Sequence, residues 1–215
     1  VRNARNGRNG HQGGDTPEPD GETLLDAVET VLRRHVAFPS DALVAVVVAW
    51  VAHCWLIESF DTTPRLAVLS PEKGSGKTRV LEVIESMLPN ADLLITPSSS
   101  VLFRMIDAAE GRYCVLLDEC DAYLGARKLS DEQEQVRAIV NSGYRRGASV
   151  ARNEVSGKDW KPRRFAVFAP VALAGIGDLP DTILDRSVVV AMKRRRPQDR
   201  VSPWRERMKE GLRPL

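Results

Sequence analysis

Apolar residues along the chain recur with two different periods, and segments of the two kinds alternate. Apolar positions three and four residues apart, together with helix-capping residues, predict helices. These helices cover residues 22–36, 41–59, 80–88, 99–109, 130–141 and 179–184. Short, continuous apolar runs predict buried strands, over residues 65–69, 92–96, 112–118 and 187–192. The alternation predicts an α/β fold with a parallel sheet that helices cover on both faces.

Residues 147–177 have a different pattern. They contain a strand, a polar turn near residues 156–159, and a second, apolar strand, which predicts a β-hairpin. Ser130 and Gln133 have the spacing of a capping box, which predicts that a helix begins there.

The pattern also predicts how the chain is divided. Residues 1–21 are rich in Gly, Asn, Arg and Pro and predict a disordered linker. We expect residues 22–60 to form helices packed on a core of residues 61–195. Residues 196–215 are a basic tail or the start of a truncated helical lid. The chain begins with Val1, which indicates a fragment of a longer protein or removal of a methionine.

The most apolar segment, residues 42–57, raises the question of a membrane helix. It has 16 residues, includes His53, and is bounded by Asp41 and Glu58, whereas a membrane-spanning helix needs about 20 apolar residues. We therefore expect a buried core helix capped by Ser40 or Asp41, with His53 as a hydrogen-bonded core residue and no membrane partner.

Amino-acid composition excludes fewer classes of function than the hydrophobic pattern does. A net charge of +2 neither favours nor excludes a polyanionic partner. The three cysteines form no C-x-x-C pair, so neither a disulfide framework nor a zinc site is predicted. The absence of an apolar leader in these residues and the three unpaired cysteines favour a reducing cytoplasm.

The segment SPEKGSGKT, residues 70–78, is the first candidate site. It lies between a predicted strand and a predicted helix, the context in which a glycine-rich loop binds phosphate through backbone N–H groups. The usual first glycine is replaced by Pro71, which is still able to turn the chain out of the strand. The predicted phosphate ligands are Gly74, Ser75, Gly76, Lys77 and Thr78.

The segment CVLLDE supplies the second half of the site. Asp118 and Glu119 follow a predicted buried strand, at the sheet edge where ligands bind in open α/β proteins. Thr78 and Asp118 are the predicted ligands of Mg²⁺, Lys77 neutralises the phosphates of ATP, and Glu119 orients the attacking water. Together the two segments predict ATP hydrolysis.

These motifs, with LPDTILDRS at residues 179–187, resemble the additional-strand P-loop ATPases of the AAA+ and superfamily 3 helicase-like group. The segments around 61–83, VLLDECD and NSGYRRGA resemble more closely a bacterial and phage domain family of unknown function, found in primase- and helicase-related proteins of mobile elements. The resemblance covers about residues 43–195. It implies a homo-oligomer, a ring or a filament, in which Arg186 acts as an arginine finger, with Arg145 and Arg146 as rivals for that role.

The chain departs from that group in two places. The fourth core strand ends in ALAGIG, where those ATPases usually carry a polar sensor residue. About 20 residues follow the last strand, too few for a complete helical lid. Both departures predict slow hydrolysis or weak nucleotide binding.

The predicted hairpin suggests what the ATPase acts on. The resemblance implies that its basic residues contact DNA, and the candidates are Arg152, Lys158, Arg163 and Arg164. The alternative for these charges is a solvated edge hairpin.

Three functions remain for the whole chain. The first is a motor or loader on DNA in phage or mobile-element replication. The second is a small-molecule kinase, which the Asp-Glu pair disfavours, and the third is a nucleotide-gated assembly switch with little turnover.

Overall fold

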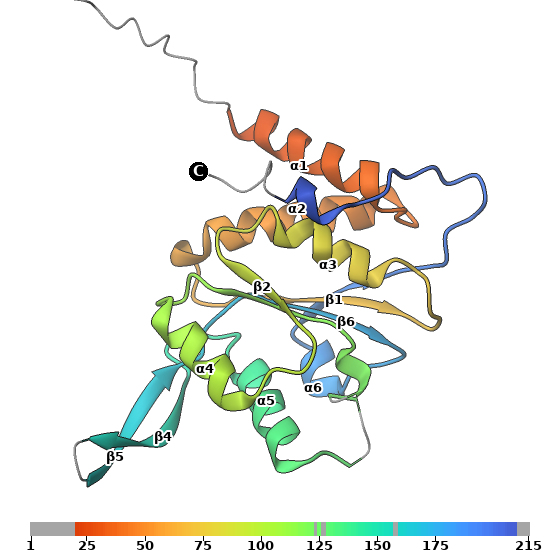
Figure 1. The fold of residues 1–215 in the computed structure, drawn as a ribbon. Coiled ribbons are helices and arrows are strands. Elements are labelled where there is room, and N and C mark those ends of the chain that lie inside the picture. The colour runs from red at the N-terminus through yellow and green to blue at the C-terminus, as the bar shows by residue number, and fades with distance from the viewer. Residues whose placement is uncertain (1–19, 123, 126–127, 157–158, 210–215) are drawn as a thin grey trace, which may run out of the picture.

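The computed structural model describes residues 20–122, 124–125, 128–156 and 159–209. Their fold is α/β, with a five-stranded parallel sheet in the order β2-β3-β6-β1-β7 (Figure 1). The strands are β1 (Arg65–Ser70), β2 (Ala91–Leu94), β3 (Cys114–Leu117), β6 (Val171–Ile176) and β7 (Ser187–Ala191). The predicted parallel α/β architecture is confirmed.

Helices cover both faces of this sheet (Figure 1). One face carries α1 (Gly21–His35), α2 (Asp41–Trp55) and α3 (Lys77–Glu85). The other carries α4 (Ser99–Ala108), α5 (Asp131–Ser142) and α6 (Asp181–Leu184). Three short 3-10 helices complete the described elements, namely η1 (Ile57–Ser59), η2 (Cys120–Ala122) and η3 (Glu206–Met208). Two hydrophobic clusters result, one on each side of the sheet. All residues of β1 and β3 are buried, as the apolar runs predicted.

The strand order determines which loops meet. Strand β6 lies between β1 and β3, so that Leu173 pairs with Ala67 on one side and with Leu117 on the other. Because all five strands are parallel, the loops after β1, β3 and β6 leave the sheet at one edge. Two strand spacings, about 10 Å, separate the loops after β1 and β3.

Helix α2 is part of the core, as predicted. Val47, Val51 and Cys54 are among its buried residues, and Trp50 donates a hydrogen bond of 3.0 Å to the carbonyl of Pro64. Ser40 is the N-cap residue, although its side chain makes no capping hydrogen bond. Among the described residues, no helix has both the length and the apolar character needed to span a membrane.

Several element boundaries differ from those predicted. Helix α1 begins at Gly21 and is capped by Asp20, so these two residues are ordered parts of the fold, whereas residues 1–19 of the predicted linker lie outside the described residues. The second helix ends at Trp55, and η1 follows it. The capping box of Ser130 and Gln133 is confirmed, with both reciprocal hydrogen bonds present.

The hairpin is formed by β4 (Ser149–Ser156) and β5 (Asp159–Ala166), which pair antiparallel and project away from the sheet (Figure 1). The predicted hairpin is present, but the prediction of an apolar second strand was wrong, because β5 is polar and largely exposed. The apolar run beyond the hairpin is β6, which starts after Pro170 and belongs to the parallel sheet.

After β7 the chain turns back across the face that carries α1 and α3 (Figure 1). Residues 193–204 are called the strap below. The backbone N–H of Ser202 donates a hydrogen bond of 2.7 Å to the carbonyl of Arg34, and Trp204 is buried in the cluster on this face. Beyond the strap, Lys209 forms an ion pair of 2.7 Å with Glu85 of α3. The last residues, 210–215, lie outside the described residues.

Candidate functional site

The loop between β1 and α3, residues 71–76, has the geometry of an anion-binding loop. Gly74 and Gly76 have φ values of 71° and 85°, a region in which residues with a Cβ are strained. Gly76 is the N-cap of α3, so the positive end of this nine-residue helix lies directly behind the loop. The two glycines let the chain turn tightly just before the helix begins.

Lys77 and Thr78 are the first two residues of α3. The Lys77 ammonium donates hydrogen bonds of 3.1 Å to the carbonyl of Glu72 and 3.2 Å to the hydroxyl of Ser75, which is buried. The lysine is therefore held across the mouth of its own loop. The Thr78 side chain is exposed. Pro71 occupies a bend and leaves the rest of the loop intact, as expected for the position of the missing glycine.

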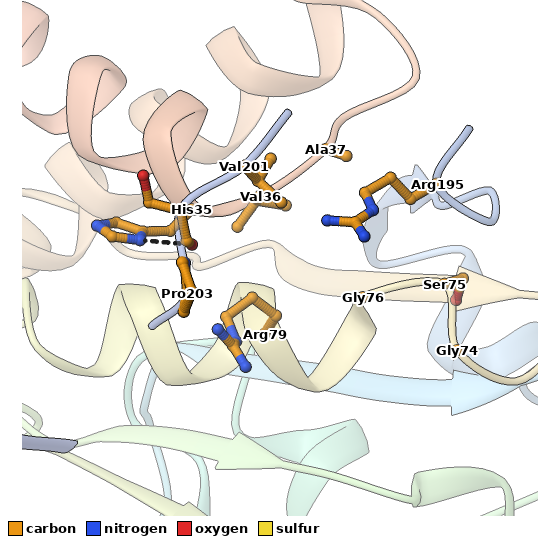
Figure 2. Close-up of a pocket in the computed structure, with 11 residues that line it drawn as sticks. His35, Val36, Ala37, Gly74, Ser75, Gly76, Arg79, Arg195, Val201 and Pro203 are labelled. Atoms are coloured by element: carbon orange, nitrogen blue, oxygen red, sulfur yellow. Dashed lines mark hydrogen bonds between the residues drawn. The ribbon is translucent and has the colours of Figure 1, made fainter. Parts of the chain in front are cut away.

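A cavity of about 330 Å³ opens beside the loop (Figure 2). Its walls come from three separate segments of chain, namely the loop at residues 74–76, the α1–α2 connection at residues 35–37, and the strap at residues 201–203. Arg79 of α3 and Arg195 of the strap complete the lining. The cavity thus connects the glycine loop with a recess that is mostly uncharged, and two guanidinium groups lie at its border.

The far wall of the cavity is fixed by His35. Its Nδ1 lies 3.0 Å from the carbonyl oxygen of Ser202 (Figure 2). Its ring packs edge-on against Trp204, with the ring centroids 5.0 Å apart. His35 is buried. These contacts hold the strap against the end of α1, so the wall is part of the folded core.

Asp118 and Glu119 follow β3 and lie at the same edge of the sheet as the glycine loop. Strand β6 separates β3 from β1, the strand that leads into the loop. The Glu119 N–H donates a hydrogen bond of 2.9 Å to Oδ1 of Asp118. Glu119 has a φ of 53°, and apart from Glu110 it is the only described residue other than glycine with a positive φ. Such a backbone conformation costs about 1 kcal/mol or more and is concentrated at functional sites. Its carboxylate is exposed at this edge.

The end of β6 explains why no polar sensor residue stands there. A Cβ on Gly175 would lie 2.7 Å from Sγ of Cys120, so no larger side chain fits. The backbone takes over the polar contacts. The Ile176 N–H donates to Oδ1 of Asp121 at 2.9 Å, and the Gly177 N–H donates to the carbonyl of Ser70 at 3.1 Å. The three loops at this edge are therefore connected by hydrogen bonds.

Cys120 is adjacent to the two carboxylates but is not suited to nucleophilic chemistry. Burial and the negative charges of Asp121 and Asp118 raise the pKa of its thiol to about 12. The thiol therefore stays protonated at neutral pH, whereas a reactive cysteine requires a thiolate.

Arg186 is not brought to this site. It precedes β7 at the opposite edge of the sheet, and the length of β1, about 17 Å, separates the two edges. Its guanidinium donates to the carbonyl of Thr182 and lies 4.8 Å from the ring centroid of Tyr144. There it borders a second cavity of about 380 Å³, which Pro64 and Val188 also line. Arg186 is too far away to contact a ligand in its own glycine loop.

The two rival arginines differ from each other. Arg146 donates hydrogen bonds of 3.1 Å to the carbonyl of Phe60 and 2.9 Å to that of Ile57, and its guanidinium lies 4.5 Å from the ring centroid of Phe168. It fastens the segment after α5 to the segment after α2. Arg145 is exposed beside it.

The predicted DNA contacts of the hairpin lie on two faces. Arg152 donates to Gln135 at 2.9 Å, and Arg163 pairs with Asp107 at 3.0 Å and with Glu154 at 3.1 Å, so both point toward α4 and α5. Arg164 belongs to the other face, which it shares with Pro162 and Trp160 at two-residue spacing. Trp160 is 70% exposed. Lys158 lies outside the described residues.

Sequence patterns did not reveal the residues that complete the cavity. Arg79 is in the first turn of α3, where its position next to the glycine loop was a usable signal. His35, Arg195 and Ser202 carry no such signal, because only the fold brings their distant segments together. Comparison of the sequence with models of protein families and with curated proteins finds no match to either.

Proposed function

We propose that this chain is a Mg²⁺-dependent ATPase whose site lies between the glycine loop and Asp118-Glu119. The observation that carries the proposal is the loop itself. Two glycines with positive φ, a lysine bonded across the loop and the start of α3 follow a fully buried strand. Such a loop is suited to bind the phosphates of a nucleotide.

The strand order supports the same proposal. The resemblance drawn from the sequence implies a P-loop ATPase of the additional-strand type, in which a further strand separates the phosphate-loop strand from the strand with the acidic pair. Here β6 separates β1 from β3 in this way. The proposed family is the AAA+ and superfamily 3 helicase-like group.

Each residue then has a role that follows from its position. Backbone N–H groups of residues 74–77 bind the β- and γ-phosphates, and the Lys77 ammonium leaves its loop contacts to neutralise them. The recess between His35 and the strap receives the ribose and base. Its volume of about 330 Å³ is within the usual range of ligand cavities.

The donors at this edge suit a magnesium ion. Thr78 has an exposed hydroxyl and Asp118 a half-buried carboxylate, and Mg²⁺ is usually bound by one or two protein oxygens together with water and substrate phosphates. When bound, the ion neutralises charge on the phosphates. Glu119, whose backbone is held in an unusual conformation, orients a water molecule toward the γ-phosphorus and accepts its proton. The new P–O bond replaces the bond to the β-phosphate oxygen, giving ADP and phosphate.

The test is ATP binding and hydrolysis by the purified chain and three variants. Lys77→Ala is expected to weaken ATP binding strongly. Glu119→Gln is expected to bind ATP normally but to hydrolyse it about 100-fold or more slowly. Lys73→Ala is the matched control, because Lys73 is an exposed lysine of the same loop. It should behave like the wild type.

The result that overturns the proposal is equally specific. If the wild type and all three variants hydrolyse ATP at one background rate and none binds ATP, the chain is not an ATPase. Hydrolysis that is lost equally in Lys73→Ala and Lys77→Ala would also contradict the role given to Lys77.

DNA is the partner that we propose for the motor or loader, and the exposed face of the hairpin is where we place its contact. Trp160 offers a surface on which a base stacks, and Arg164 offers a cation for the backbone. Arg152 and Arg163 are already paired within the protein. Single-stranded DNA should therefore stimulate ATP hydrolysis, and assembly into a ring would bring Arg186 to the site of a neighbouring copy.

A nucleotide-gated assembly switch is the second candidate. The observation that favours it is the end of β6, where Gly175 has no side chain and the Ile176 backbone N–H makes the polar contact in place of a polar sensor side chain. Such a switch would assemble when ATP binds and hydrolyse it negligibly. Sedimentation with ATP, ADP or no nucleotide, measured beside the hydrolysis rate, distinguishes the two functions.

A further inference from the structure

Arg195 is the arginine that the strap brings to the glycine loop. It lines the same cavity as Gly74 and Gly76, and its guanidinium end extends from the strap into the space above Gly76 (Figure 2). The two segments are more than a hundred residues apart in the sequence. No motif in the sequence pointed to this arginine, which is the last residue of the predicted core.

The strap is fastened on both sides of Arg195. Before it, the Met192 N–H donates to the carbonyl of Leu69 at 2.7 Å, and the Arg194 N–H donates to Glu72 at 3.4 Å. After it, Arg196 and Asp199 close a hydrogen-bonded turn. The backbone at Arg195 is thus positioned before any ligand binds, which lowers the entropic cost of using its side chain.

The neighbouring charges are already paired, whereas that of Arg195 is not. Both carboxylate oxygens of Asp199 accept hydrogen bonds from Arg196, which chiefly lowers the pKa of Asp199. Nε of Arg79 lies 2.7 Å from Glu82, an ionic contact without hydrogen-bond geometry. Within the described part of the chain, the Arg195 guanidinium forms no hydrogen bond or ion pair, and its charge is the smallest of the causes that lower the pKa of Asp199. It is therefore available to a ligand.

We infer that Arg195 binds the α- or β-phosphate of the nucleotide held by the glycine loop. This inference rests on the proposed function. A guanidinium is suited to a phosphate because it donates two parallel hydrogen bonds. The cavity that Arg195 lines does not include Asp118 or Glu119, so it faces the part of the nucleotide that leads away from the cleaved bond. Arg195 is thus a phosphate-binding residue, and the strap takes over part of the task of a helical lid.

The test compares Arg195→Ala with Arg194→Ala, an adjacent arginine that does not line the cavity. Calorimetry with ATP, ADP and adenosine shows which part of the nucleotide Arg195 contacts. Arg195→Ala is expected to lower the affinity for ATP and for ADP by the same factor, about 10- to 100-fold. The affinity for adenosine should stay unchanged. The KM for ATP rises while kcat stays, Arg195→Lys recovers part of the affinity, and Arg194→Ala resembles the wild type.

Three results would overturn the inference. If Arg195→Ala keeps wild-type affinity for ATP and ADP while Lys77→Ala loses it, the nucleotide site stands but Arg195 is not part of it. If adenosine binding falls as much as ADP binding, the contact is not to phosphate. If the wild type binds neither ATP nor ADP, the proposed function fails and the inference with it. An unchanged melting temperature shows that each variant is folded.

Discussion

The guanidinium of Arg65 donates two hydrogen bonds to the carbonyl of Val140, at 3.1 Å from Nε and 2.7 Å from Nη2. A third, from Nη1, reaches the carbonyl of Ala169 at 2.7 Å. Arg65 is 1% exposed and begins β1, whereas Val140 lies near the end of α5. Burial and the charge of Arg186 lower the pKa of Arg65. One buried cation thus links the first residue of β1 to the carbonyl end of a helix, where positive charge is favoured.

Replacing Arg65 by Met should destabilise the fold by about 2–4 kcal/mol, because two buried carbonyls lose their donor. Urea unfolding measures the change. Arg145→Met is the control, since Arg145 is exposed, and it should shift the free energy of unfolding little. Equal effects of the two substitutions would contradict the role given to Arg65.

The positive φ of Glu119 predicts a difference in stability between two variants that both lack the catalytic carboxylate. At a φ of 53°, glycine is less strained than alanine. We expect Glu119→Gly to be about 1 kcal/mol more stable than Glu119→Ala, while neither hydrolyses ATP. Denaturant unfolding of the two variants checks this, and an alanine variant that equals the glycine variant would show that the backbone there is unstrained.

The contact between Gly175 and Cys120 predicts a compensating pair of substitutions. Gly175→Ala alone should displace the loop after β3 and reduce hydrolysis, because its Cβ would lie 2.7 Å from Sγ. Cys120→Ala removes that sulfur, so the double variant should recover part of the stability and activity. A double-mutant cycle measures the coupling between the two positions. Strictly additive effects would mean that the two residues do not constrain each other.

Two adjacent arginines of β5 should behave differently. Arg163→Ala removes ion pairs to Asp107 and Glu154 and is expected to loosen the hairpin against α4. Arg164→Ala should leave stability unchanged but weaken single-stranded DNA binding and reduce its salt dependence. Thermal unfolding and DNA titrations at two salt concentrations separate the effects. DNA binding that depends on Arg163 and not on Arg164 would place the contact on the opposite face.

His53 predicts a dependence of stability on pH. Burial lowers the pKa of His53 below its usual 6.5, and its Nε2 lies 3.0 Å from the hydroxyl of Thr63. The unfolded chain therefore binds the proton more tightly, and this residue's contribution to stability is lost as the pH falls below about 6.5. His53→Gln should show a smaller loss of stability between pH 7 and pH 5. A slope identical to that of the wild type would contradict this.

The strands and helices that pack on two sides were predictable, because burial leaves a strong apolar pattern. Strands β1 and β3 and helix α2 belong to this class. Strand β5 was not, since it stands away from the core and only Phe165 in it is buried. The end of α2 was placed four residues too late because η1 continues a helical spacing with a different hydrogen-bond pattern.

The candidate site also has one part that could be predicted from the sequence and one part that could not. The glycine loop and the acidic pair are continuous segments, so their spacing alone suggested phosphate chemistry. The cavity beside the loop depends on tertiary packing between His35, Arg195 and Ser202. The sequence suggested that the segment after β7 leaves the site incomplete, whereas the structure folds that segment back as the strap, which forms one wall of the cavity.

The separation of Arg186 from the glycine loop by the length of β1 restricts how copies of this chain associate if Arg186 acts on a neighbour. Each copy would have Arg186 at the edge where the strands of its sheet begin and the glycine loop at the edge where they end. A side-by-side antiparallel pair would supply both sites at once, because a two-fold interface brings residue i of one copy to residue j of the other and the reverse. In a head-to-tail series that does not close, by contrast, one copy at its end holds nucleotide without a neighbouring arginine.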